Sequence, residues 1–191
     1  MKKGIILSIT AVLLIGLGAC KKEASTPPTD TVDFEYFEYA VIPPNVSAGI
    51  GIIPAGMSVD AHEGKFETNT DQELQNKGYT SSQVLSIKGQ LLKFELTNNP
   101  SQNLDFMDTI RIYVNKGDGA TADRILFAYK YNYPTGLRTL DLDLTNVDVK
   151  DVFRSDSVKM TINGTKRTGT HTVQGGTEMK VSANVRAVVQ P

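Results

Sequence analysis

The sequence predicts an all-β fold: an antiparallel β-sandwich of about eight strands with one or two short helices. Three observations support this prediction. Beyond residue 33 the chain consists mainly of short runs rich in β-branched and aromatic residues, which Gly, Pro and Asn interrupt. In several runs apolar and polar residues alternate, as they do in strands with one buried face. The segments with helical character are too short to organise the fold.

Eight runs have the composition of strands. The clearest is 180–189, where Val or Ala at every second position alternates with Lys, Ser, Asn and Arg. One face of this strand should lie in a core and the other in water. Residues 110–114 and 140–144 alternate similarly, which is typical of antiparallel strands because parallel strands are apolar on both faces. The predicted strands cover residues 34–42, 57–67, 91–97, 109–115, 124–131, 138–144, 157–163 and 180–189.

Turns and short helices connect these strands. Residues 116–119, Lys-Gly-Asp-Gly, predict a bend between two strands, and Gly175-Gly176 predicts the return into the last strand. A helix is predicted over 70–75, where Thr and Asp provide capping groups and Gly78 follows the end. A second short helix is predicted within 146–153, because its apolar residues share one helical face.

The first nineteen residues have the pattern of a secretory signal peptide. Lys2 and Lys3 precede an uncharged run, rich in Ile and Leu, that extends from Gly4 to Ala19. The run is shorter than the roughly 20 apolar residues of a membrane-spanning helix, and it ends in small residues suited to cleavage. We therefore expect residues 1–19 to be removed from the mature protein.

The chain has one cysteine, Cys20, directly after this run. The segment Leu17-Gly18-Ala19-Cys20 resembles the lipobox of bacterial lipoproteins. The resemblance implies that cleavage occurs before Cys20, that Cys20 is acylated, and that two or three acyl chains bind the protein to a membrane. The alternative is an ordinary signal peptide with an incidental cysteine, which would leave an unpaired thiol in an oxidising compartment.

Residues 20–33 predict a flexible tether, because they are small, polar and proline-containing without apolar periodicity. Asp30-Thr31-Val32 resembles an O-glycosylation signal of one phylum of Gram-negative bacteria, which makes Thr31 a candidate glycosylation site. Residues 34–191 are expected to form one β-sandwich domain. The segment NLDFMDTIRIYV, with the hairpin after it, resembles small β-sandwich lipoproteins of unassigned function from Gram-negative bacteria, and this resemblance supports the architecture. The lipobox resemblance implies a location in the cell envelope, with the outer membrane favoured and the leaflet left open.

The charge balance gives no sign of nucleic-acid binding. Removing residues 1–19 takes Lys2 and Lys3 from the 20 basic residues and leaves 18 against 21 acidic ones. A nucleic-acid-binding protein would need a basic face. Because no second cysteine exists, the core has to supply the stability that disulfides give many exported domains.

No residue pattern indicates catalysis or a cofactor. The only histidines, His62 and His171, are over a hundred residues apart among polar neighbours, too few for a zinc site. No G-x-S-x-G or phosphate-binding glycine loop occurs. The acidic residues of DLDLTNVDVKD are candidate ligands for a hard cation such as Ca²⁺, although a solvated face is the preferred interpretation. These candidates are Asp141, Asp143, Asp148 and Asp151.

Two further segments are candidate binding sites. Tyr129, Tyr131 and Tyr133 alternate along one predicted strand, so we expect their rings on one face, where they could stack on sugars or contact a protein. Aromatic residues also cluster in FEYFEY, residues 34–39. The isoleucines of the Gly-rich and Pro-containing segment 48–56 form either a plug at one end of the sandwich or the lining of an apolar pocket. They are Ile50, Ile52 and Ile53.

The sequence thus indicates a lipid-anchored, non-enzymatic envelope protein whose sandwich binds a carbohydrate, a partner protein or an apolar ligand. Two alternatives remain open. An envelope hydrolase could use a pair of carboxylates alone, as glycosidases do. A purely structural accessory subunit would instead expose a broad apolar patch.

Overall fold

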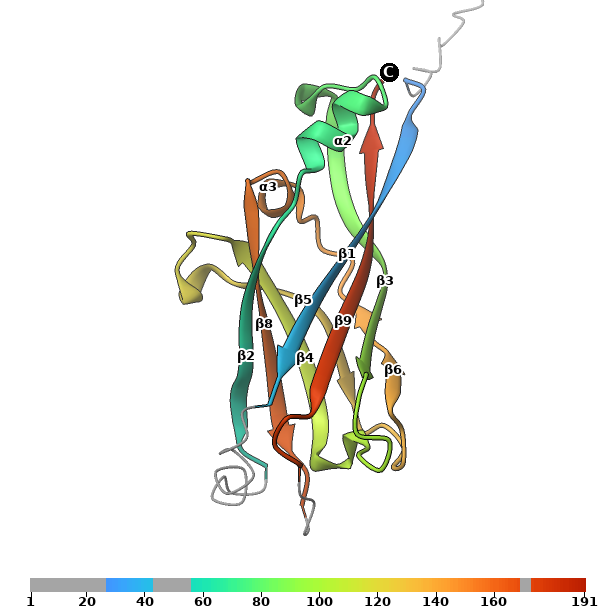
Figure 1. The fold of residues 1–191 in the computed structure, drawn as a ribbon. Coiled ribbons are helices and arrows are strands. Elements are labelled where there is room, and N and C mark those ends of the chain that lie inside the picture. Colours follow the sequence, from blue (N-terminus) through green and yellow to red (C-terminus); the bar gives the residue numbers. More distant parts are fainter. Residues whose placement is uncertain (1–26, 43–55, 169–172) are drawn as a thin grey trace, which may run out of the picture.

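The computed structural model describes residues 27–42, 56–168 and 173–191. In these residues nine strands form two antiparallel sheets that pack as a β-sandwich, which confirms the predicted fold class (Figure 1). The four-stranded sheet has the order β1-β9-β3-β6, and the five-stranded sheet has the order β2-β8-β4-β5-β7. The strands are β1 (Asp30–Val41), β2 (Ser58–Glu67), β3 (Val84–Leu96), β4 (Met107–Lys116), β5 (Ile125–Tyr131), β6 (Thr139–Asp141), β7 (Asp143–Leu144), β8 (Ser157–Lys166) and β9 (Glu178–Val189).

The core lies between the two sheets and follows the alternation of the sequence. In β9 every second residue, from Met179 to Val189, is buried. An aromatic cluster joins the sheets: the Phe153 ring centre lies 5.3 Å from that of Tyr36 on β1 and 5.9 Å from that of Phe127 on β5. Phe153 belongs to the short helix α3 (Lys150–Phe153), so this helix packs its apolar end into the sandwich.

The predicted strand 138–144 is divided between the two sheets. Its first half, β6, pairs with β3, whereas its second half, β7, pairs with β5. Leu142 lies between them, buried, and its N–H donates to the carbonyl of Leu92. Because leucines occupy alternate positions throughout, the sequence pattern continues across a change of sheet and does not reveal it.

Two strands, β1 and β3, begin four or more residues earlier than predicted. β3 starts at Val84, seven residues before the predicted start, because a register shift between Gly89 and Leu91 interrupts the alternation that marks a strand. A Cβ at Gly89 would lie 2.7 Å from Leu144 Cδ2, so packing requires glycine at this position. β1 starts at Asp30, which places the last residues of the predicted tether in a strand paired with β9.

The two predicted helices are present as α2 (Thr70–Asn76) and α3, while η1 (Ser81–Gln83), η2 (Leu104–Phe106) and η3 (Thr121–Asp123) are 3₁₀ turns. The prediction of a side-chain cap on α2 is wrong, because its N-cap, Asn69, is in the left-handed region with φ of 49° and accepts no capping hydrogen bond. Its end is as predicted, since Gly78 follows with φ of 85°. Within the described ranges, no helix is long and apolar enough to cross a membrane.

Candidate functional site

One row of side chains crosses the outer face of the five-stranded sheet. The strand register places Asp60 of β2 opposite Asn163 of β8, Asn163 opposite Arg111 of β4, and Arg111 opposite Tyr129 of β5. Asp143 of β7 completes the row opposite Tyr129. The neighbouring residues on β4 and β8 point into the core and are fully buried, so the row itself faces outward.

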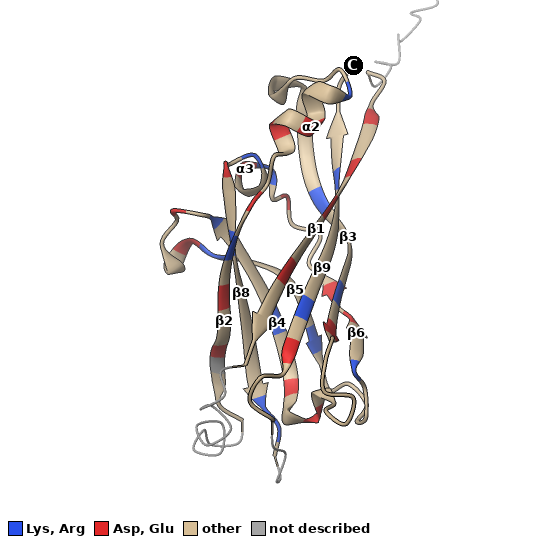
Figure 2. Cartoon of the chain, viewed as in Figure 1, with Lys and Arg blue, Asp and Glu red and all other residues tan. Residues whose placement is uncertain are grey.

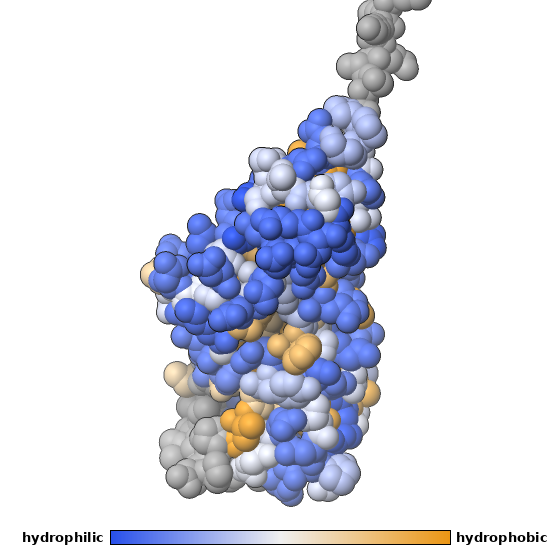
Figure 3. All heavy atoms as spheres, turned by 45° about the horizontal axis from the view of Figure 1, so that its top comes forward, coloured by the Kyte–Doolittle hydropathy of each residue, from blue (hydrophilic) through white to orange (hydrophobic). Residues whose placement is uncertain are grey.

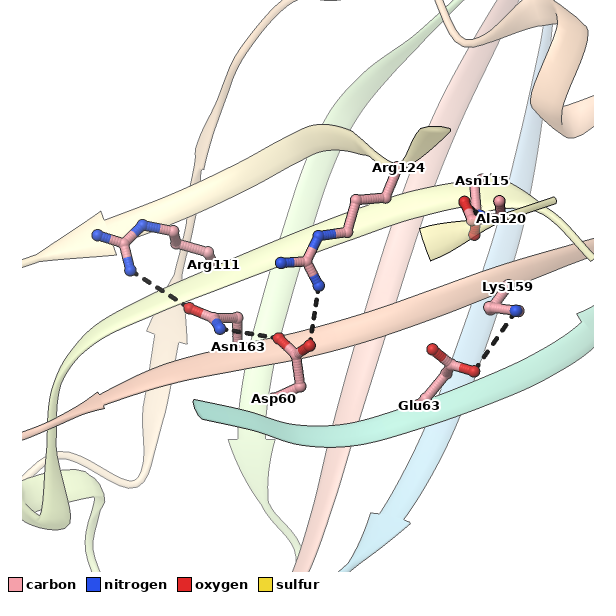
Figure 4. A network of polar contacts seen from close by, with 8 residues as sticks. All are labelled: Asp60, Glu63, Arg111, Asn115, Ala120, Arg124, Lys159 and Asn163. Carbon is pink, nitrogen blue, oxygen red and sulfur yellow. Dashed lines mark hydrogen bonds and ion pairs between the residues drawn. The ribbon is translucent and has the colours of Figure 1, made fainter. Parts of the chain in front are cut away.

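Hydrogen bonds connect the polar half of this row (Figure 4). Asn163 donates from Nδ2 to Asp60 Oδ1 over 2.8 Å and accepts at Oδ1 from Arg111 over 3.3 Å. Arg124 donates to Asp60 Oδ2 over 2.9 Å. Burial raises the pKa of Asp60, but the hydrogen bonds from Asn163 and Arg124 and the charge of Arg124 outweigh it and hold that pKa below its ordinary value. Asp60 is therefore ionised at neutral pH.

Tyrosine rings occupy the other half of the face. Tyr129 and Tyr131 have ring centres 4.8 Å apart, and Tyr131 is 43% exposed. Both arginines lie over rings: Arg111 Cζ is 5.3 Å from the Tyr131 centre, and Arg124 Cζ is 4.3 Å from the Tyr113 centre. We use the name tyrosine–arginine face for the five residues Arg111, Tyr113, Arg124, Tyr129 and Tyr131. It combines apolar ring surfaces with cationic donors on neighbouring strands.

The prediction that Tyr133 shares this face is wrong. β5 ends at Tyr131, and Asn132 takes a left-handed conformation with φ of 48°, which breaks the alternation. The Tyr133 ring consequently turns inward and is 4% exposed, and its hydroxyl donates to the carbonyls of Leu104 and Met107. Burial raises the pKa of Tyr133 well above its ordinary value. Tyr133 is thus a core residue and belongs to no binding surface.

The four acidic metal candidates do not assemble a site. Asp141 and Asp143 belong to different sheets, contrary to the prediction that they share a strand. Asp143 pairs with Lys130, and Asp148 accepts from the backbone N–H groups of Ile87 and Lys150. All four side chains, including that of Asp151, are exposed. Among the residues that the structure describes, no group of three or more His, Cys, Asp or Glu residues could hold a metal ion.

The remaining sequence candidates divide between described and undescribed residues. Thr31 is exposed, but it lies in β1 opposite Val188 and not in a tether. His62 lies on β2, with Nε2 3.4 Å from Glu38 Oε1 of β1. The lipobox with Cys20, the isoleucines of segment 48–56 and His171 fall outside the described residues. The isoleucines concerned are Ile50, Ile52 and Ile53.

The outer face of the four-stranded sheet carries a second aromatic surface. In FEYFEY the side chains alternate: Phe34 and Tyr36 are buried, whereas Phe37 is 60% and Tyr39 is 47% exposed. Lys180 Nζ lies 5.6 Å and 5.7 Å from the Phe37 and Tyr39 ring centres. In a strand, residues two positions apart share a face, so the sequence separates Phe34 and Tyr36 from Phe37 and Tyr39. It does not indicate which of the two pairs is buried.

One face of the molecule is mainly hydrophilic, with local apolar patches. Figure 3 shows one face on which hydrophilic residues predominate and apolar patches occur in the lower half. Acidic and basic residues are interspersed along the strands of both sheets (Figure 2). An open groove of about 680 Å³ lies between β2, α2 and the segment after α3, with Lys65, Asn69 and Arg154 among its lining residues. The tyrosine–arginine face is separate from this groove.

Comparisons with known proteins do not assign a function. No protein-family model matches the chain, and no curated protein matches it. The chain is similar at 14% identity to a structure of infectious bursal disease virus Gx strain, with a TM-score of 0.36, over 87% of this chain and 32% of that one. It is similar at 10% identity to a Desmodium yellow mottle tymovirus structure, with a TM-score of 0.32, over 100% and 97% of the two chains. Similarity this low carries no argument about what the protein does.

Proposed function

We propose that the protein is a non-enzymatic lipoprotein of the Gram-negative cell envelope, held in the outer membrane by acylated Cys20, and that it binds carbohydrate on its five-stranded sheet. The observation that carries the binding proposal is the Tyr129–Tyr131 ring pair, 4.8 Å between centres, in which Tyr131 is exposed and Tyr129 half-buried, beside the hydrogen-bonded row of Arg111, Asn163 and Asp60. The signal peptide and the lipobox support the proposed location.

The chemistry of this face suits a sugar. A pyranose has an apolar C–H surface that packs on an aromatic ring, and hydroxyls that both donate and accept hydrogen bonds. Tyr131 offers an exposed ring, Arg111 offers N–H donors, and Asp60 offers an ionised acceptor. Because the row runs across the sheet and not into a cavity, it favours an extended chain over a single small molecule.

A polysaccharide panel tests the binding proposal. Affinity electrophoresis of the purified protein through gels containing individual polysaccharides should show retardation by at least one of them. Tyr131→Ala should abolish the retardation, whereas Tyr39→Ala, an exposed tyrosine on the opposite sheet, should preserve it. If the two variants lose retardation equally, the assignment to the five-stranded sheet is wrong.

Acylation is tested separately. Cells that express the protein should incorporate radiolabelled palmitate into it, and Cys20→Ala should abolish the incorporation. Label in the Cys20→Ala variant, or no label in the wild type, would contradict the anchor.

The exposed side chains of the four-stranded sheet favour a second candidate function, an accessory subunit that contacts a partner protein. Phe37, Tyr39 and Val41 of β1 and Leu91 of β3 are each more than 40% exposed. Large exposed apolar side chains of this kind mark contact surfaces when they gather. The carboxylate hydrolase is less favoured, because Asp141, Asp143, Asp148 and Asp151 are exposed and dispersed, and a glycosidase needs two carboxylates facing one cleft.

A further inference from the structure

Arg111 is a cation without a carboxylate partner among the described residues. Its hydrogen bonds all come from one nitrogen, Nη1, and reach only neutral acceptors. These acceptors are Ser58 Oγ at 3.3 Å, Asn163 Oδ1 at 3.3 Å and Thr165 Oγ1 at 3.4 Å. All three distances are long, since N–H···O bonds cluster near about 2.9 Å.

The other cations of the same network are neutralised. Of the three cations drawn in Figure 4, Arg124 lies 2.9 Å from Asp60 and Lys159 lies 3.5 Å from Glu63. Asp60 does not neutralise Arg111 directly, because Asn163 lies between them and bonds to both. Of these three cations, Arg111 is therefore the one that has no carboxylate partner among the described residues.

The guanidinium also has donors to spare. It carries five N–H groups in a planar fork, and the hydrogen bonds within the described residues use only Nη1. The fork formed by Nε and Nη2 matches the two oxygens of a carboxylate, and Arg–carboxylate pairs of this kind are among the stronger hydrogen-bonded contacts. Tyr131, whose ring centre is 5.3 Å from Arg111 Cζ, provides an exposed aromatic ring beside this guanidinium.

We infer that the carbohydrate is acidic, and that the carboxylate of a uronic acid residue binds the Nε–Nη2 side of Arg111 while its sugar ring packs against Tyr131. This inference rests on the proposed carbohydrate-binding function and adds the class of sugar. The five-stranded sheet would then select charged polysaccharides over neutral ones of the same shape.

Calorimetry with a matched pair of ligands tests the inference. The probes are oligogalacturonate and the same oligosaccharide with its carboxylates methyl-esterified, which retains the sugar ring and removes the charge. The wild-type chain should bind the acid about tenfold or more tightly than the ester, and added salt should weaken only the binding of the acid. Arg111→Gln should remove this preference, and Arg111→Lys, which keeps the charge but not the fork, should retain only part of it.

Arg186→Gln provides the control, since Arg186 lies on the other sheet and binds Asp33 over 2.6 Å. Its preference for the acid should equal that of the wild type. NMR signals of the Arg111 side chain should shift with the acid and not with the ester, which a merely structural role for Arg111 would not produce. Thermal melts of each variant establish that it is folded.

Four other results would overturn either the inference of an acidic sugar or the proposed carbohydrate binding. Equal binding of acid and ester by the wild type would overturn the inference and leave carbohydrate binding intact. Binding of neutral polysaccharides only would do the same. Competition by inorganic phosphate as effective as that by the uronate would also overturn it, because the site would then select any anion. Retardation by no polysaccharide at all would refute the proposed function itself.

Discussion

Arg111 lies over the ring of Tyr131, although these two residues are diagonal neighbours and not direct partners in the β4–β5 register. Thr109 is the residue opposite Tyr131, and Arg111 is opposite Tyr129. The long arginine side chain spans the diagonal and brings its guanidinium carbon to 5.3 Å from the ring centre. This contact joins the polar row of the five-stranded sheet to the exposed ring of Tyr131.

Removing the hydroxyl of Tyr133 should destabilise the protein, whereas the same change at Tyr131 should not. The buried Tyr133 hydroxyl donates to two backbone carbonyls, so Tyr133→Phe should lower the free energy of unfolding by about 1–2 kcal/mol. Tyr131→Phe, at an exposed ring, should change it by less than about 0.5 kcal/mol. Urea denaturation measures both. Equal effects would contradict the different placement of the two tyrosines.

Asp60 should contribute to the acid sensitivity of the fold. Burial raises its pKa, but Asn163 and Arg124 outweigh burial and hold the pKa below the ordinary value of 3.8. The stabilisation is therefore complete above that value and is lost as the pH falls through the lowered native pKa. Between about pH 6 and about pH 3, Asp60→Asn should lose less stability than the wild type in thermal melts. A loss equal to that of the wild type would show that Asp60 is not held in this network.

Gly89→Ala should destabilise the protein through overpacking. The new Cβ would lie 2.7 Å from Leu144 Cδ2 and 3.0 Å from Phe127 Cζ, so the core would have to shift at a cost of about 1–3 kcal/mol. In a double-mutant cycle with Leu144→Ala, the two changes should cost less together than the sum of the single effects, since the smaller side chain makes room. Additive effects in denaturant titrations would show that Leu144 is not the obstacle.

The second candidate function predicts a contact through β1. Phe37→Ser should reduce chemical cross-linking of the protein to its envelope partners in intact cells, because this ring is 60% exposed, a larger fraction than that of Tyr39 or Val41 on the same strand. Tyr131→Ala, on the opposite sheet, is the matched control and should leave the cross-links unchanged. Identical cross-linking patterns in the wild type and Phe37→Ser would remove the support for a partner on this sheet.

Local patterns predicted the strands better than they predicted the site. The alternation of Val and Ala with polar residues identified β9 and its buried face, because a strand with one wet face needs a period of two. The same rule predicted the wrong face for Tyr133, because the left-handed residue Asn132 interrupts the alternation and the next side chain, that of Tyr133, turns into the core. It also concealed the change of sheet at Leu142, where the alternation continues unbroken.

The polar row could not be predicted, because it depends on strand pairing. Asn163 and Asp60 are 103 positions apart, and their contact requires β2 and β8 to pair in one register with a shift between Asp60 and His62. Nothing in the neighbourhood of Arg111 in the sequence distinguishes it from the other arginines. That it has no carboxylate partner among the described residues follows only from the pairing of the strands in the five-stranded sheet.

The most direct test of carbohydrate binding on the five-stranded sheet is an NMR titration of the ¹⁵N-labelled protein with oligogalacturonate. Shift changes should concentrate on β4, β5 and β8 around Arg111, Tyr129 and Asn163, and Tyr131→Ala should suppress them. Shift changes centred on Phe37 and Tyr39 of β1, or a spectrum that no acidic or neutral oligosaccharide alters, would contradict carbohydrate binding on this sheet.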